Sequence, residues 1–331
     1  MPLRTSATSK YEAAYIRFRN DDGMKNVGYR VLSALSRGLD FLFILFFAGL
    51  FAIGLYGYWD IESVFDKAEG KHFASYKPGT GQEELQMGFE ELKKRNPDTA
   101  GWLEVYGTSI DYPVMQAADN HKYLTTDALG RYSGSGSIFL DAANKNDFSD
   151  RKLVIHGHHM AHHAMFGDLD DFADARFFAN HLYGDLYYAG KHHGLRILAY
   201  LRVLGDDQRI YRKPDENQQA WQELLVYLKE HAVPNRFNTI TDRELDQARL
   251  VILSTCTEET EGRQLVVAQV VEETFENSFE KEQKNTRTNE IQQTREGLSK
   301  QQVFLLLLGF WMVCLLVRML CSQQLRKKNK K

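Results

Sequence analysis

Two long apolar stretches near the ends of the chain place the strongest constraint on how it folds. Residues 41–59 carry no charge, and as a helix they are long enough to span a bilayer core of about 30 Å. Residues 303–317 form a second apolar run, which continues to 321 because Arg318 can extend its side chain to the membrane interface. The first stretch lies far from the start and lacks a small-x-small cleavage motif, unlike a signal peptide. We predict transmembrane helices at 39–59 and 303–321, with buried core helices as the alternative.

Charges on either side of these stretches predict how the chain lies in the cell membrane. Residues 1–38 carry seven Lys/Arg and three Asp/Glu, and residues 318–331 carry six Lys/Arg and no acid. Basic flanks stay on the cytoplasmic side. We therefore expect both termini in the cytoplasm and the region between the two spans outside the cell. Residues 39–317 hold 28 Lys/Arg against 41 Asp/Glu, and this acidic balance argues against nucleic acid as a partner.

Between the two spans, the pattern predicts one extracellular, mainly β domain. Short apolar and β-branched runs alternate with Gly, Asp and Asn turns, and amphipathic helices are predicted at 82–95 and 215–231. Short helices are expected at 165–181. The predicted segments in order are a basic cytoplasmic tail (1–38), a transmembrane helix (39–59), a tether (60–81), the catalytic domain (82–278), a polar stalk (279–302), a transmembrane helix (303–321) and a basic cytoplasmic tail (322–331).

One cysteine, Cys256, lies where chemistry is expected. It closes an apolar run at residues 250–256 that predicts a buried strand. The other cysteines, Cys314 and Cys321, lie in or beside the second apolar stretch, so Cys256 has no partner for a disulfide within the exported domain. A lone thiol in an oxidising compartment is a candidate reactive group. An inert buried cysteine is the alternative.

Arg263 and a group of histidines supply the other parts needed for acyl transfer through a thioester. Arg263 opens the next apolar run, and five histidines lie within residues 156–163 at the end of another predicted strand. A thiolate attacks a carbonyl carbon, a cation such as Arg263 stabilises the oxyanion, and a histidine protonates the leaving amine. Spacing alone does not say which histidine acts. A structural role for Arg263 remains the alternative.

The same histidines raise a second possibility, because imidazole is a common zinc ligand. The cluster at 156–163 has no His-Glu-x-x-His helix and no paired cysteines. Alternate residues at the end of a strand also point to opposite sides. We therefore expect no metal site and no cofactor, and we expect the histidines outside catalysis to be solvated loop residues.

Several separated motifs resemble those of sortases, the cysteine transpeptidases of Gram-positive cell surfaces. VILSTC, which ends at Cys256, is followed by an Arg that opens the next strand, and this looks like the sortase active-site signature. GSIFLD at 136–141 and VIHGHHM at 154–160 are similar to class B sortases in particular. This chain departs from the class B pattern at Ile252, where Thr is usual, at His156, where Tyr is usual, and in its short segment between the cysteine and the arginine.

The resemblance covers about residues 85–275 and implies a mainly β fold. It implies a sortase-type eight-stranded β-barrel with an N-terminal helix and helices in the long connections, here flanked by two transmembrane helices. It also implies that His158 is the catalytic histidine that acts with Cys256 and Arg263. The residues that it implies for the sorting-signal groove are Asn120, Leu124, Tyr211 and Ser254.

Together these features predict a membrane-anchored cysteine transpeptidase. It would cleave a C-terminal sorting signal of secreted surface or pilin proteins through a thioacyl-enzyme, and transfer the acyl group to a pilin lysine or a cell-wall peptide. The second anchor resembles pilus-building sortases, which favours pilin polymerisation over attachment to the cell wall. Two alternatives remain. One is an exported metal-dependent hydrolase that uses the histidines at 156–163, and the other is a non-catalytic two-span scaffold that binds surface peptides.

Overall fold

The computed structural model divides into two units, Met1–Lys67 and Ala68–Lys331. The residues that it describes are 7–79, 83–212, 217–256, 262–280 and 308. Helix α1 (Ala7–Ala68) contains the segment Arg30–Trp59, which is long and apolar enough to cross a membrane and is not buried by other described residues. The second predicted span, 303–321, lies outside the described residues except for Leu308. The stalk beyond residue 280 and the tail at 322–331 also lie outside them.

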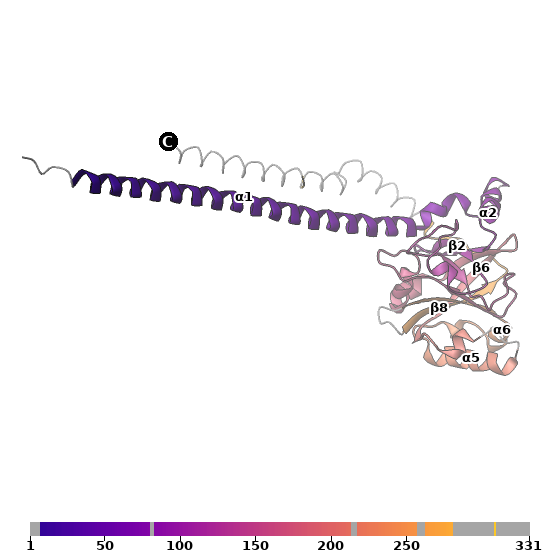
Figure 1. Ribbon diagram of the computed structural model, residues 1–331. Coiled ribbons are helices and arrows are strands. Elements are labelled where there is room, and N and C mark those ends of the chain that lie inside the picture. Colours follow the sequence, from indigo (N-terminus) through magenta and orange to yellow (C-terminus); the bar gives the residue numbers. More distant parts are fainter. Residues whose placement is uncertain (1–6, 80–82, 213–216, 257–261, 281–307, 309–331) are drawn as a thin grey trace, which may run out of the picture. The chain divides into compact units, whose positions relative to one another are not determined.

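The second unit is built around a closed barrel of eight strands in the order β1-β2-β3-β4-β7-β8-β6-β5 (Figure 1). The strands are β1 (Thr99–Val105), β2 (Asp111–Met115), β3 (Ile138–Leu140), β4 (Lys152–His156), β5 (Tyr183–Tyr188), β6 (Lys191–Leu204), β7 (Arg249–Cys256) and β8 (Gly262–Val271). The pairs β2·β3 and β4·β7 are parallel, and the other neighbours are antiparallel. The prediction of an eight-stranded barrel is confirmed.

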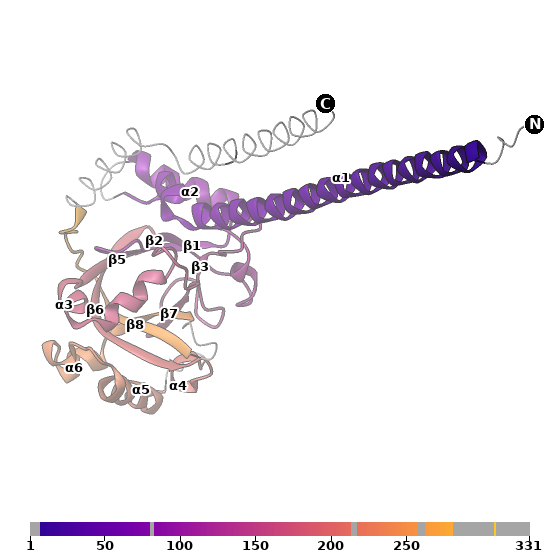
Figure 2. The same cartoon turned by 90° about the vertical axis from the view of Figure 1, so that its left-hand side faces the viewer.

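Helices precede the barrel and occupy its long connections. The longer ones are α2 (Glu83–Arg95) before β1 and α5 (Gln218–His231) between β6 and β7. Figures 1 and 2 show α5 and α6 on one side of the barrel and α2 on the opposite side. The shorter helices are η2 (Lys122–Leu124), η3 (Gly167–Ala173), α3 (Ala175–Asn180), α4 (Gln208–Tyr211), η4 (Phe237–Thr239) and α6 (Asp242–Asp246).

The middle of strand β7 is apolar because both faces of the strand are buried there. Val251 and Leu253 belong to the core inside the barrel, whereas Leu250 and Ile252 belong to a second core that includes residues of α5. Successive side chains of a strand point to opposite faces, so a strand covered on both sides needs apolar residues at successive positions. This double burial fixes the height and the rotation of the strand that ends at Cys256.

Helix α5 covers the second core. Its local sequence determines where the helix begins and which of its faces is buried. The side chain of Asn217 caps its first turn by accepting a hydrogen bond from the amide of Gln219. Trp221, Leu224 and Leu228 follow at helical spacing and are buried against the barrel. The helix predicted at 215–231 is therefore present, and residues 213–216 lie outside the described part.

Residues 68–79, which fall in the segment expected to be a tether, belong to the second unit. Helix α1 continues to Ala68, and a 3₁₀ helix, η1 (Gly70–Tyr76), follows it. Phe73 of η1 is buried in the barrel core, and the hydroxyl of Tyr112 donates to the carbonyl of Ala68 at 2.9 Å. The compact unit thus begins at Ala68, whereas the sequence pattern placed the start of the domain at residue 82. The contacts that extend the unit join residues far apart in the sequence, and a local pattern does not predict such contacts.

Candidate active site

A groove of about 750 Å³ lies where the ends of β3, β4 and β7 meet the long connections. Six of the seven site residues expected from the sequence line it, namely Asn120, Leu124, His158, Tyr211, Ser254 and Arg263. The seventh, Cys256, is the last residue of β7. The structure therefore gathers residues from widely separated segments along one groove.

His158 is held at the edge of this groove by a backbone carbonyl. It follows Gly157 at the end of β4, and its Nε2 lies 2.8 Å from the carbonyl oxygen of Leu124. A carbonyl oxygen can only accept, so Nε2 carries the proton and donates. In the neutral ring, Nδ1 is then the nitrogen that is open to a second proton. The amide of Phe166 donates to the His158 carbonyl at 3.0 Å and holds the backbone in place.

The Leu124 carbonyl in turn depends on a glycine in the neighbouring turn. Gly136 has a φ of +59°, in the left-handed region that favours glycine. A Cβ at this position would lie 2.3 Å from the carbonyl oxygen of Tyr123 and 2.7 Å from that of Leu124. Any larger residue would therefore displace the oxygen that orients His158.

Cys256 and Arg263 lie opposite each other on neighbouring strands. They are partners in the antiparallel register of β7 and β8. Because side chains alternate along a strand and directly paired residues share a face, positions 256 and 263 fall on the face that carries Ser254. Arg263 lines the groove, and its Nη1 donates to the carbonyl of Gly262 at 3.1 Å. The side chain of Cys256 and the connecting residues 257–261 lie outside the described part.

A buried lysine holds the connection that carries Tyr211. Nζ of Lys152, at the start of β4, donates to the carbonyls of Ile210 at 2.7 Å and Arg212 at 2.8 Å. Tyr211 lies between these two residues, and its hydroxyl is 2.8 Å from Oγ of Ser254. Burial, and to a smaller extent the charge of Arg212, lowers the pKa of Lys152 to about 8. Lys152 thereby positions the end of α4 against β7.

A second polar contact lies in the same groove, between His156 and Asp141. Nε2 of His156 is 2.9 Å from Oδ2 of Asp141, and this oxygen also accepts from Nδ2 of Asn120 at 2.9 Å. The amide of Ala143 donates to Oδ1 at 2.8 Å. Burial by itself raises the pKa of Asp141, but the hydrogen bonds from His156, Ala143 and Asn120 outweigh it and hold this pKa below its usual value.

The histidines of the 156–163 cluster have separate partners. His159 lies 2.8 Å from Asp170, and the side chains of His156 and His159 are 20% and 21% exposed. The expectation that both are solvated loop residues is therefore wrong, since each is largely covered and carries a carboxylate partner. The structure brings in one carboxylate from the residue that follows β3 and the other from η3, which the sequence pattern did not indicate.

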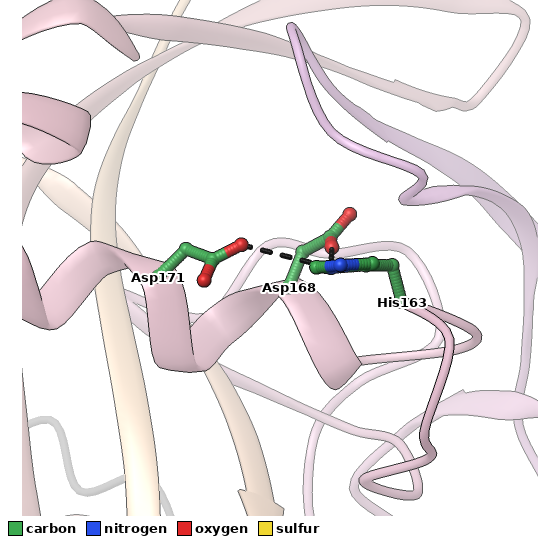
Figure 3. Close-up of side chains that lie close together, drawn as sticks. All are labelled: His163, Asp168 and Asp171. Atoms are coloured by element: carbon green, nitrogen blue, oxygen red, sulfur yellow. Dashed lines mark hydrogen bonds and ion pairs between the residues drawn. The ribbon is translucent and has the colours of Figure 1, made fainter.

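Among the described residues, one group of potential metal ligands lies together, at His163, Asp168 and Asp171 (Figure 3). Their ligand atoms all lie within 4.8 Å of one another. Nδ1 of His163 is 2.5 Å from Asp168 and 3.6 Å from Asp171, as in an imidazole–carboxylate ion pair. His163 is the one histidine of the predicted cluster in this group, so the described geometry does not assemble the cluster around a single ion.

The chain is similar in sequence and in structure to known class B sortases. No family model matches the chain. Sortase B of Staphylococcus aureus is 32% identical over 193 residues, which are 57% of this chain and 77% of that protein. A mutant form of Clostridium perfringens sortase B has a similar structure, with a TM-score of 0.56 and 28% identity, over 61% of this chain and 96% of that one. A Streptococcus pyogenes class B sortase involved in pilus biogenesis has a TM-score of 0.50 and 32% identity, over 57% of this chain and 100% of that one.

The closed barrel with a groove at its strand ends defines a sortase fold, in a family of cysteine transpeptidases. The chain belongs to the sortase family and is similar to its class B members. The sequence motifs thus indicated the family, and six of the residues named from them line the groove. Two supporting residues, Lys152 and Asp141, were not assigned roles, because their partners come from other segments of the chain. A lysine directly before the apolar run of β4 is the signal that could have revealed the role of Lys152.

Proposed function

We propose that the chain is a membrane-anchored sortase that uses Cys256 as its nucleophile. The groove carries this proposal, because it collects His158, Arg263 and Ser254 at the end of the strand on which Cys256 lies. Membership of the sortase family supports the reaction class. A nucleophile, an acid–base group and a fixed cation are together sufficient for acyl transfer without a cofactor.

The proposed reaction begins when the Cys256 thiolate attacks a backbone carbonyl carbon of the sorting signal. A C–S bond forms, and the charge that develops on the oxygen is stabilised by the Arg263 guanidinium. The C–N bond then breaks, and His158 gives its Nδ1 proton to the leaving amine. An acceptor amine attacks the resulting thioester, a new C–N bond forms, and the C–S bond breaks. His158 takes up a proton from this amine, and the thiolate is restored.

The proposed substrates are secreted surface or pilin proteins that carry a C-terminal sorting signal. Similarity to a Streptococcus pyogenes sortase involved in pilus biogenesis supports a pilin lysine as the acceptor, with a cell-wall peptide as the second candidate. Asn120, Leu124, Tyr211 and Ser254 line the groove in which the signal would lie. In this proposal, α1 provides one anchor and residues 303–321 a second, so that the catalytic domain is outside the cell and both termini are cytoplasmic.

The test is covalent capture of the thioacyl-enzyme by the full-length chain in detergent micelles. The wild-type chain is incubated with a mass-coded library of capped hexapeptides and analysed by intact-mass spectrometry. We expect an acyl adduct on the wild type and none on Cys256→Ala. Cys314→Ala is the matched control, since it removes a thiol elsewhere, and it should form the adduct. Triglycine should then release the adduct by transfer.

Three outcomes would contradict the proposal. An adduct that survives in Cys256→Ala would place the nucleophile elsewhere. Peptide hydrolysis that tolerates Cys256→Ala but is lost on treatment with a chelator would support a metal-dependent hydrolase. Peptide binding without any adduct, and equal in Cys256→Ala, would support a non-catalytic scaffold.

A further inference from the structure

One pair of groove residues, His156 and Asp141, has no part in the proposed reaction. His156 ends β4, whereas Asp141 directly follows β3, and the antiparallel pairing of these strands brings the two side chains together. Nε2 of His156 lies 2.9 Å from Oδ2 of Asp141, and the side chains are 20% and 13% exposed. Both residues line the groove. Both side chains are therefore largely covered within the groove.

The carboxylate of Asp141 determines which ring nitrogen of His156 faces it as a donor. Both of its oxygens accept hydrogen bonds, from the Asn120 side chain at 2.9 Å and from the Ala143 amide at 2.8 Å. Such contacts favour the ionised carboxylate, which can only accept. Nε2 of His156 must therefore carry the proton in this pair. In the neutral ring, Nδ1 is consequently an unprotonated hydrogen-bond acceptor.

Nδ1 of His156 is available to a ligand. It has no hydrogen-bond partner within the part of the chain that the structure describes, and it is not among the buried polar atoms that lack one. The ring packs beside the rings of Phe139, with centroids 5.2 Å apart, and Tyr211, with centroids 6.1 Å apart. These neighbours and Asp141 hold the imidazole in one orientation, so the acceptor atom has a defined position in the groove.

We propose that His156 selects the peptide substrate by accepting, at Nδ1, a hydrogen bond from a side chain of the sorting signal. The side chain that faces it would carry an N–H or O–H donor, as Ser, Thr, Asn and Gln do. The proposal rests on the proposed function and names its substrate class. A site with a fixed, largely covered acceptor discriminates against an apolar isostere, because the acceptor then loses its water without gaining a partner.

The test uses the full-length chain in detergent and a peptide that forms the adduct in the capture experiment. At each position of that peptide, Thr is compared with Val and Asn with Leu, since each pair is similar in shape and differs in the donor. We expect the wild type to favour the donor at one position by about tenfold in the second-order rate of adduct formation. His156→Phe should lose this preference while still acylating on the apolar peptide.

Two further variants separate a direct contact from a general disturbance of the groove. His156→Gln retains an acceptor oxygen and should restore part of the preference. It also keeps the proposal testable if His156→Phe does not fold. His121→Phe makes the same substitution at another histidine that lines the groove, and it should retain the preference whatever its effect on the rate.

The outcomes that would overturn the assignment are distinct from failure of the proposed function. A preference that persists in His156→Phe would place the discriminating contact elsewhere. A wild type that forms adducts but shows no preference at any position would mean that the groove reads the peptide backbone alone. A wild type that forms no adduct with any peptide would instead remove the transpeptidase function on which the assignment rests.

Discussion

At the scale of single residues, Lys152 shows how a buried charge can support the groove. Its ammonium lies beneath the connection that carries Tyr211 and donates to the carbonyls of Ile210 and Arg212, at 2.7 and 2.8 Å. Without this donor, two carbonyl oxygens beside the groove would lose their partner, and a buried unpaired carbonyl is unfavourable. The lysine is thus retained although its own burial is unfavourable.

The pKa of Lys152 predicts a pH dependence of stability. Burial lowers this pKa from 10.5 to about 8 in the folded chain, so the unfolded chain binds the proton more tightly between these values. The unfavourable contribution of the charged lysine is fully present below pH 8 and disappears as the pH rises toward 10.5. The free energy of unfolding of the wild type should therefore rise relative to that of Lys152→Met across this window, by up to roughly 3 kcal/mol.

This prediction is checked by chemical denaturation of both chains at a series of pH values, followed by tryptophan fluorescence. Subtracting the Lys152→Met curve removes the contribution of other groups that titrate in the same range. A difference in the free energy of unfolding that stays constant from neutral to alkaline pH would contradict the assigned protonation of Lys152.

At the scale of elements, η1 contributes to the barrel core although its local sequence does not predict this. The segment is short and mostly polar, yet Phe73 lies in the barrel core and Gly70 packs against β2. A Cβ at Gly70 would lie 2.5 Å from the carbonyl oxygen of Asp111, so the close approach requires glycine. Two anchoring points within one turn make η1 a fixed start of the catalytic unit.

Truncating Phe73 should therefore destabilise the barrel. Phe73→Ala removes a ring that is 8% exposed, and the cavity that remains should lower the free energy of unfolding by about 3 kcal/mol. Ser75→Ala is the matched control within η1, because Ser75 is exposed and its loss should change stability by less than about 0.5 kcal/mol. Equal midpoints of thermal unfolding for the two variants would show that η1 does not contribute to the core.

At the scale of the whole molecule, charged and apolar residues are unevenly distributed along the chain. The segment Arg30–Trp59 of α1 presents apolar side chains that no other described residue covers, and such a surface is stable in lipid rather than in water. Residues 39–317 carry the excess of acid, whereas both ends of the chain are basic. This asymmetry is the basis for the proposed two-span topology.

Protease protection in intact cells tests this topology. With an epitope tag at each end, protease added outside should degrade the domain at 82–278 and leave both tags intact, because both ends are proposed to lie in the cytoplasm. Deleting either 39–59 or 303–321 should leave the chain in the membrane fraction, whereas deleting both should release it. Loss of the C-terminal tag in intact cells would contradict a second span.

Elements with local signals could be predicted from the order of the residues. The apolar runs of the barrel strands predicted their positions because a strand buried on both faces needs apolar residues at successive positions, as residues 250–253 of β7 show. The face of α5 followed from helical spacing alone. Cys256 and Arg263 were found as the ends of two such runs, and the family resemblance added the choice of His158 and the residues of the groove.

Contacts between residues far apart in the chain became known only from the folded arrangement. His156 and Asp141 pair because β3 and β4 are antiparallel neighbours in a particular register. Lys152 meets Ile210 because α4 is held against the barrel, and Phe73 is buried because η1 returns to the core. Such contacts depend on how the barrel closes, and register and closure are set by the whole sheet acting together. A local pattern records which residues are apolar or polar, but not the partner that each will find.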